Sequence, residues 1–335
     1  FAGRVNQFRF TLQDSMLQAR LVRRYGVKNT GMGKNADQII ERSNTPGIFQ
    51  SYKILAYTPD KKAVVVDMTE LFLESSRLTN PFPSYAGNSL YGFVQRIHKF
   101  QSQRSELLGI CGNDNSMSVR CNLGFNVDRL VLGSFMQAKD VPVSVTVNKI
   151  LMLLPEDPMR PRLADSRIGV NAIIQTELPD VCQGIKTYYI TKRWRIEPVD
   201  EIRYKQGEMV DVKKPIVFYI DTLMPDSWIK YVKAGAEAWN AAFEKIGLRN
   251  VVRTELFPKD SSFDAGDIHN SVIRYAPSWM YYPQYSMHTD PRTGEILNAS
   301  VYLPANVASY FYTSRTEETM AVDPSVRKAR LSKEQ

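Results

Sequence analysis

A continuous apolar run followed by a long amphipathic pattern restricts the fold of this chain more than any other sequence feature. The run KPIVFYID (214–221) is typical of a strand that is buried on both faces. After it, apolar residues recur at helical spacings of three and four, at Val232, Ala236, Trp239, Phe243 and Ile246. Three further strand patterns follow, at 250–257, 271–278 and 295–303. This order predicts a mixed sheet backed by one long helix.

The helix pattern has its own start and stop signals. Asp226 or Ser227 is suited to cap the first turn, and Gly247 is suited to end the helix. Because the apolar stripe of such a helix faces the core, we expect Trp239 and Phe243 to be buried against the strand at 216–220.

A tight turn precedes the last strand pattern. In DPRTG (290–294), Pro291 sets one backbone angle and Gly294 permits a positive φ. In the strand that follows, alternate residues point to opposite faces. One face is apolar (Leu297, Ala299, Val301, Leu303), and the other is mostly polar (Ile296, Asn298, Ser300, Tyr302). The pattern predicts a strand with one face against the helix and one face in water.

The first half of the chain reads as strands and turns. Strand patterns occur at 16–25, 51–58, 62–69, 118–126 and 141–155. Pro59-Asp60-Lys61 separates two of them and predicts a hairpin. We therefore predict an α+β chain with a β-rich N-terminal domain (1–155), a connector (156–213) and a sheet-plus-helix domain (214–335).

Charge is distributed unevenly along the chain. Residues 1–150 hold 19 Lys and Arg against 11 Asp and Glu, whereas residues 151–335 hold 24 of each. We interpret the basic half as a solvated surface, with an anion-binding surface as the alternative. No basic-aromatic motif accompanies the charge, so we expect no nucleic-acid partner.

Three cysteines leave two interpretations open. Cys111 and Cys121 flank GNDNSMSV, a sequence that can bring them together in a disulfide of the kind found in exported proteins. The alternative is that these two and Cys182 are unpaired small core residues. Their spacing is not that of a zinc site.

No catalytic constellation is visible in the sequence. The histidines are His98, His269 and His288, and none lies in an HExxH motif, so we assign no catalytic residue and no metal ligand. His288 follows an aromatic cluster in a segment that we interpret as a loop. Asp264 and Asp267 are spaced as in a capping turn rather than a calcium loop. The arginines between 160 and 195 lie among acidic residues, which favours interdomain salt bridges over an anion site.

Several long motifs carry a resemblance to a known family. They are PMRPRLADSRIG, KRWRIEP, KPIVFYID, WIKYVKAGAEAWNAAFEKIGLRN, SVIRYAP, DPRTGEILNASVYLP and VDPSVRKARL, in that order. They resemble bacterial zinc-dependent metalloproteases, known mainly from Bacteroidota, with a metzincin-like catalytic domain behind upstream domains of unknown function. The resemblance covers nearly the whole chain and is most specific from 158 to 330.

The resemblance implies more than this chain contains. It implies zinc held by an HExxH helix beyond Gln335, so we expect this chain to be an internal segment of a larger exported protein. That protein would be a periplasmic, secreted or outer-membrane-associated protein, such as a lipoprotein. In metzincin-like sheets, a peptide or protein substrate adds as a further strand along an antiparallel edge strand. We expect the strand at 295–303 to be that edge, with Ile296, Asn298, Ala299, Ser300 and Tyr302 contacting the substrate.

Two functions follow from this interpretation. The first is part of an exported zinc-dependent metalloendopeptidase that hydrolyses peptide bonds through zinc-activated water. The alternative is a non-catalytic member or fragment that acts as a binding or structural component of a cell-envelope assembly. In either case, we expect this chain alone to be inactive. Its expected partners are the C-terminal half of the same protein, beyond Gln335, and proteins of the cell envelope.

Overall fold

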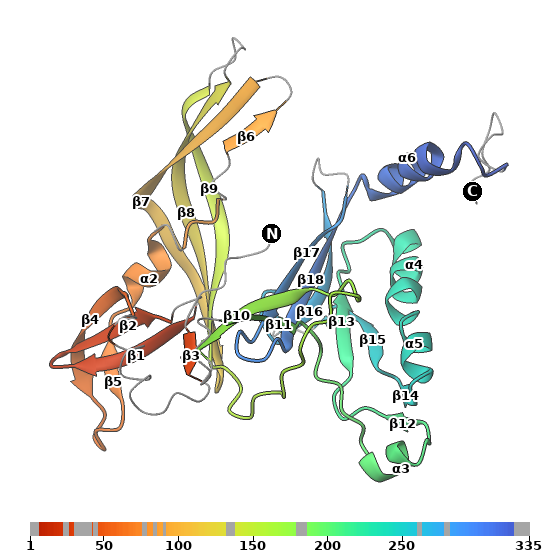
Figure 1. The fold of residues 1–335 in the computed structure, drawn as a ribbon. Coiled ribbons are helices and arrows are strands. Elements are labelled where there is room, and N and C mark those ends of the chain that lie inside the picture. The colour runs from red at the N-terminus through yellow and green to blue at the C-terminus, as the bar shows by residue number, and fades with distance from the viewer. Residues whose placement is uncertain are drawn as a thin grey trace. The chain divides into compact units, whose positions relative to one another are not determined.

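The computed structural model consists of two compact units (Figure 1). The N-terminal unit comprises residues 3–192 with 291–294, and the C-terminal unit comprises 193–290 with 295–335. The residues that the structure describes are 7–22, 27–29, 42, 46–75, 79–82, 86–89, 92–131, 138–178, 186–259, 263–277 and 282–324. The chain is α+β and mainly sheet, which confirms the predicted class. The domain bounds at 155 and 213 remain a prediction.

Three sheets form the N-terminal unit. The first has the order β1-β2-β4-β5, the second β6-β7-β8-β9 and the third β11-β10-β3. The strands of the first are β1 (Phe8–Gln13), β2 (Met16–Leu21), β4 (Ile48–Tyr57) and β5 (Val64–Val66). Those of the second are β6 (Ala86–Ser89), β7 (Gly92–Asn113), β8 (Ser116–Val131) and β9 (Ala138–Met152). The third contains β3 (Val27–Asn29), β10 (Ala172–Leu178) and β11 (Lys186–Thr191), and α2 (Thr69–Leu73) is a short helix.

The predicted hairpin at Pro59-Asp60-Lys61 is confirmed. Strands β4 and β5 pair in antiparallel fashion on either side of it. The Asp60 carboxylate accepts hydrogen bonds from the Thr58 hydroxyl and the Lys62 amide, at 2.6 and 3.2 Å. These bonds lower the pKa of Asp60 and hold the turn.

The core of the N-terminal unit follows from alternation along β8. Its inward residues Val119, Cys121, Leu123 and Phe125 are buried and pack with Leu71 and Phe72 of α2. The Lys149 ammonium donates to the carbonyl oxygens of Leu71 and Glu74, at 3.1 and 2.7 Å, at the C-terminal end of α2. Burial lowers the pKa of Lys149 to about 8.

The disulfide interpretation is wrong. Cys111 is exposed, Cys121 is fully buried, and both are free. The hairpin register explains why, since Cys111 lies opposite Ser118 and Cys121 lies opposite Leu107. The core interpretation therefore holds for Cys121 and not for Cys111. Cys182 lies outside the described residues.

A five-stranded mixed sheet dominates the C-terminal unit. Its order is β15-β13-β16-β18-β17, in which the first four strands are parallel and β17 is antiparallel to β18. These strands are β13 (Ile216–Ile220), β15 (Val252–Leu256), β16 (Ser271–Ala276), β17 (Gln284–Thr289) and β18 (Ile296–Pro304). A separate pair joins β12 (Val210–Asp211) and β14 (Leu248–Arg249). The helices are α3 (Glu201–Lys205), α4 (Asp226–Glu237), α5 (Asn240–Glu244) and α6 (Val307–Thr319). The predicted mixed sheet with a backing helix is confirmed.

The predicted long helix is interrupted between α4 and α5. Val232 and Ala236 pack against the core around Ile220, and Phe243 packs half-buried against the core around Ile216. Trp239, however, is 67% exposed, so its predicted burial is wrong. Gly247 ends the helical segment with φ +82°, as predicted. No side chain caps the start of α4, contrary to the prediction.

Candidate functional site

One edge of the five-stranded sheet is closed by side chains of the backing helices. The Val252 amide donates to Asn240 Oδ1, and Asn240 Nδ2 donates to the Val252 carbonyl, both at 2.8 Å. The Thr254 amide donates to Glu237 Oε1 at 3.1 Å. The amide and carbonyl of Val252 and the amide of Thr254, three outward backbone groups of β15, are therefore occupied. This arrangement also explains Trp239, which lies about 200° around the helix from Glu237 and so points away from the sheet.

The opposite edge of the sheet is β17, and we call it open because no described segment pairs with its outer side. It pairs with β18 from Gln284↔Tyr302 to His288↔Asn298, with an irregularity before Thr289. Within the described part of the chain, no third strand adjoins β17, and no other segment donates to or accepts from its outward backbone groups. An unpaired antiparallel edge of this kind is able to accept an additional strand.

The position of β18 differs from the prediction. It lies between β16 and β17, so it is an interior strand and its backbone is paired on both sides. The expectation that 295–303 forms the edge is wrong because 284–289, which we interpreted as a loop, forms the outer strand. The signal was present in the alternation of Tyr285 and Met287 with Gln284, Ser286 and His288. The turn at 290–294 does reverse the chain as predicted, with Gly294 at φ +76°.

The face of β18 that was expected to be wet is mostly buried. Asn298 is 3% exposed, Ile296 and Ser300 are also buried, and Tyr302 is half-buried. Ala299, the fifth expected site residue, lies on the opposite face and is half-buried. The expectation of a solvated face is therefore wrong. Contact of these five residues with a substrate remains a prediction, and the buried side chains of Asn298 and Ser300 make it harder to meet.

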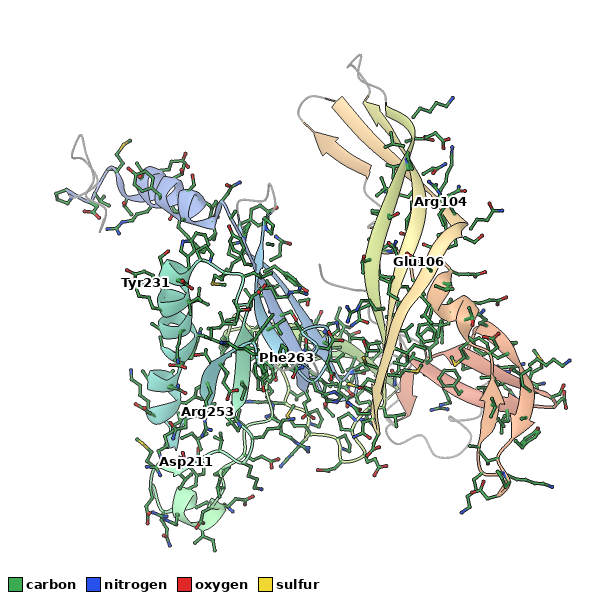
Figure 2. All side chains as sticks on the ribbon, turned by 180° about the vertical axis from the view of Figure 1, so that it is seen from behind. Arg104, Glu106, Asp211, Tyr231, Arg253 and Phe263 are labelled. Atoms are coloured by element: carbon green, nitrogen blue, oxygen red, sulfur yellow. The ribbon has the colours of Figure 1, made fainter. Side chains whose placement is uncertain are left out.

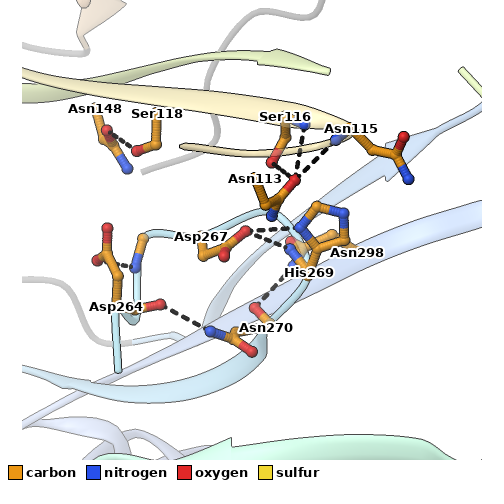
Figure 3. A network of polar contacts seen from close by, with 11 residues as sticks. Asn113, Asn115, Ser116, Ser118, Asn148, Asp264, Asp267, His269, Asn270 and Asn298 are labelled. Atoms are coloured by element: carbon orange, nitrogen blue, oxygen red, sulfur yellow. Dashed lines mark hydrogen bonds and ion pairs between the residues drawn. The ribbon is translucent and has the colours of Figure 1, made fainter. Parts of the chain in front are cut away.

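A turn segment at 263–270 lies against this polar face. Asn298 Nδ2 donates to the Asn270 carbonyl at 2.8 Å (Figure 3). The ring centroids of Phe263 (labelled in Figure 2) and Tyr219 are 5.0 Å apart. Tyr219 lies opposite Val272 on the next strand, and Val272 lies opposite Ser300, so all three belong to the same face of the sheet. The segment thus covers a face that the sequence pattern alone marks as solvated.

Asp264 and Asp267 build the turn itself. The Gly266 amide donates to Asp264 Oδ1 at 2.8 Å, and the His269 amide donates to Asp267 Oδ1 at 2.9 Å (Figure 3). Asn270 Nδ2 donates to the Asp264 carbonyl at 2.9 Å. The capping-turn interpretation is confirmed, since both carboxylates accept backbone amides.

His288 lies on β17 directly opposite Asn298. Its Nδ1 is 3.4 Å from Asn298 Oδ1. Burial lowers the pKa of His288, and the hydrogen bond to Asn298 opposes this in part. The imidazole is therefore neutral at pH 7 and helps to fix β17 to β18.

Two of the connector arginines, Arg167 and Arg195, form ion pairs, and each of these pairs lies within one unit rather than between domains. Arg167 pairs with Asp165 at 2.5 Å, and Arg195 lies 3.4 Å from Glu197 and 3.9 Å from Glu295. Among the described residues, no group of three His, Cys, Asp or Glu side chains is placed to hold a metal ion. In the same residues, no helix is both long enough and apolar enough to span a membrane.

Comparison with known proteins gives one match. A family model described as "Domain of unknown function (DUF5117)" matches residues 3–199, which is more than half of the chain. This match ends before the five-stranded sheet begins. Neither the curated proteins nor the solved structures contain a match.

Proposed function

We propose a function for this chain, which belongs to the family of the domain of unknown function DUF5117. The proposed function is that the chain is part of an exported zinc-dependent metalloendopeptidase. The proposal draws on the resemblance of 158–330 to such proteases and on the sheet that lies beyond the family match. In it, the C-terminal unit is the upper half of a metzincin-like catalytic domain. The protein acts in the periplasm, at the outer membrane or outside the cell.

The open edge of β17 is the observation that carries the proposal. A peptide that adds to this edge in antiparallel fashion gains main-chain hydrogen bonds to Gln284–Thr289, and its side chains alternate between the two faces of the sheet. The closed edge at β15 supports the same conclusion. Proteins usually protect free strand edges against unwanted pairing, and this sheet protects one edge and leaves the other open.

The role proposed for these residues is to bind and orient the substrate. Zinc in a protease of this class polarises the scissile carbonyl and activates water. The described residues do not supply a ligand set for it, so we assign no zinc ligand to them and derive no step through the metal. An extended peptide held along β17 is fixed in register, which is the positioning that a hydrolytic step needs.

A first experiment tests binding with amide hydrogen exchange on the full chain. Unfolded casein serves as the peptide probe. We expect casein to slow exchange of the amides of β17 and to leave Val252 and Thr254 of β15 unchanged, because their amides are already bonded. Equal protection of both edges, or none at β17, overturns the proposed site.

A second experiment tests hydrolysis with the natural protein isolated from its source. We expect it to cleave casein, to lose this activity with a zinc chelator and to regain it with added zinc. Protection of β17 without any cleavage under these conditions supports the alternative, in which the same edge binds a partner strand in a cell-envelope assembly.

A further inference from the structure

The outer strand β17 and segments near it carry exposed aromatic side chains. They come from β17, from the residues just before it and from α6, which follows β18 in the chain. Tyr285 is 64% exposed. The ring centroids of Tyr282 and Tyr310 are 6.3 Å apart, and those of Tyr310 and Phe311 are 5.5 Å apart. We name this group the aromatic patch, and its members are Tyr282, Tyr285, Tyr310, Phe311 and Tyr312.

The patch residues lie in two uncharged stretches of sequence, whereas the second half of α6 carries Arg315, Glu317 and Glu318. No Asp, Glu, Lys or Arg occurs at 275–289 or at 296–314. Among the described residues of α6, only Val307 is buried, so the helix does not use its aromatic residues to pack against a core. An uncharged, exposed cluster of large apolar side chains is typical of an interaction surface.

The register of the sheet places Tyr285 where a bound peptide would meet it. Tyr285 lies opposite Val301, which packs against the core beneath α4. Tyr285 therefore belongs to the face of the sheet that carries the helix. A peptide paired along the outer side of β17 projects alternate side chains to that same face, and directly opposed side chains in adjacent strands touch.

We infer that the peptide bound on β17 is selected by an uncharged aromatic side chain that packs on Tyr285, Tyr282 and Tyr310. This inference rests on the proposed function, because it requires a strand on β17. An aromatic side chain matches the patch in two ways. It adds apolar and ring-to-ring contact, and it places no charge beside Tyr282, Tyr285 and Tyr310, whose stretches of sequence supply none to pair with it. The open backbone beside the patch favours a peptide over a sugar or a lipid surface, which offer no extended main chain.

The test compares two uncharged peptides with the full chain. Both are extended, Thr- and Val-rich ten-residue peptides that differ only at one central position, which is Phe or Ala. We expect the Phe peptide to bind about fivefold more tightly. Tyr285→Ala should remove this difference. Tyr231→Ala should preserve it, because Tyr231 is an exposed tyrosine of α4 outside the patch (Figure 2).

The outcomes separate the two proposals. If both peptides protect the amides of β17 with equal affinity, strand addition holds and aromatic selection is overturned. If neither peptide protects β17, the proposed site fails and the inference fails with it. Binding of uncharged lipid vesicles or of oligosaccharide that depends on Tyr285, without binding of the Phe peptide, also overturns the inference. Circular dichroism of Tyr285→Ala and of a second variant, Tyr310→Ala, checks that the fold is kept.

Discussion

The two edges of the C-terminal sheet differ in whether side chains cover their outward backbone groups. At β15, Glu237 and Asn240 reach from the backing helices and occupy the outward amides and carbonyl of the strand. At β17, the described residues provide no such cover, and uncharged aromatic side chains stand beside the strand. The difference teaches that one sheet can cover one edge with side chains while, among the described residues, its other edge remains available for pairing with another strand.

The largest effect is expected at the turn that leads from β17 to β18. Gly294 has φ +76°, and a Cβ there would lie 2.3 Å from the carbonyl oxygen of Thr191. Gly294→Ala should lower the free energy of unfolding by about 3 kcal/mol, from strain and backbone displacement together. Chemical denaturation measures this. Gly235→Ala is the matched control, since nothing lies within 4 Å of its Cβ. A Gly294→Ala variant as stable as the wild type would contradict the turn geometry.

The next effect concerns the helices that close the β15 edge. Phe243 packs half-buried against the core cluster that contains Ile216 and Val252, whereas Trp239 is exposed. Phe243→Ala should destabilise the chain by about 2 kcal/mol, less than for a fully buried ring. Trp239→Ala should cost less than about 0.5 kcal/mol. Urea denaturation of both variants compares them directly, and the reverse order would restore the burial that the sequence pattern predicts for Trp239.

A smaller effect is expected when the closed edge is opened. Asn240→Ala removes the partners of the Val252 amide and carbonyl, and leaving them unmade should cost about 1–2 kcal/mol. Asn240→Asp retains an acceptor for the Val252 amide, so its stability should fall between that of the wild type and that of Asn240→Ala. Light scattering should also show more aggregation of Asn240→Ala, since β15 then resembles an unprotected edge. Unchanged stability and solubility would show that the side-chain cover of β15 is dispensable.

The smallest effect is a pH dependence at the open edge. Burial lowers the pKa of His288 in the folded chain, whereas an unfolded histidine titrates near about 6.5. The unfolded state therefore binds more protons as the pH falls through this range, so acidification should destabilise the fold. Urea midpoints at pH 7.5 and 5.5 should differ less in His288→Gln than in the wild type.

Much of the local structure was predictable from the sequence. The Pro59-Asp60-Lys61 hairpin, the buried strand at 216–220 and the turn ended by Gly294 all depend on residues close together in the chain. Alternation along β8 likewise announces its buried residues. The missed strand β17 has the same kind of alternation, but Pro283 directly before it favoured a loop interpretation.

The candidate site was only partly predictable. The sequence indicated a mixed sheet and a strand after DPRTG, and it placed five site residues on that strand. It did not indicate that 284–289 pairs outside it, nor that Asn270 and Phe263 come to lie against its polar face. The polarity of Asn298 and Ser300 led us to expect a solvated face. A buried polar residue can also be hydrogen-bonded inside the protein, and the sequence does not distinguish the two cases.

By itself, the sequence determined the α+β class, the turns, the strand periodicity and the apolar face that meets α4. Each depends on backbone preferences and hydrophobic patterns within a few residues. Only the tertiary structure decided which strand is an edge, which edge is closed and which way Trp239 points. Strand order arises from pairing between distant segments, and a side chain such as Asn240 finds its partner only after the helix has docked on the sheet.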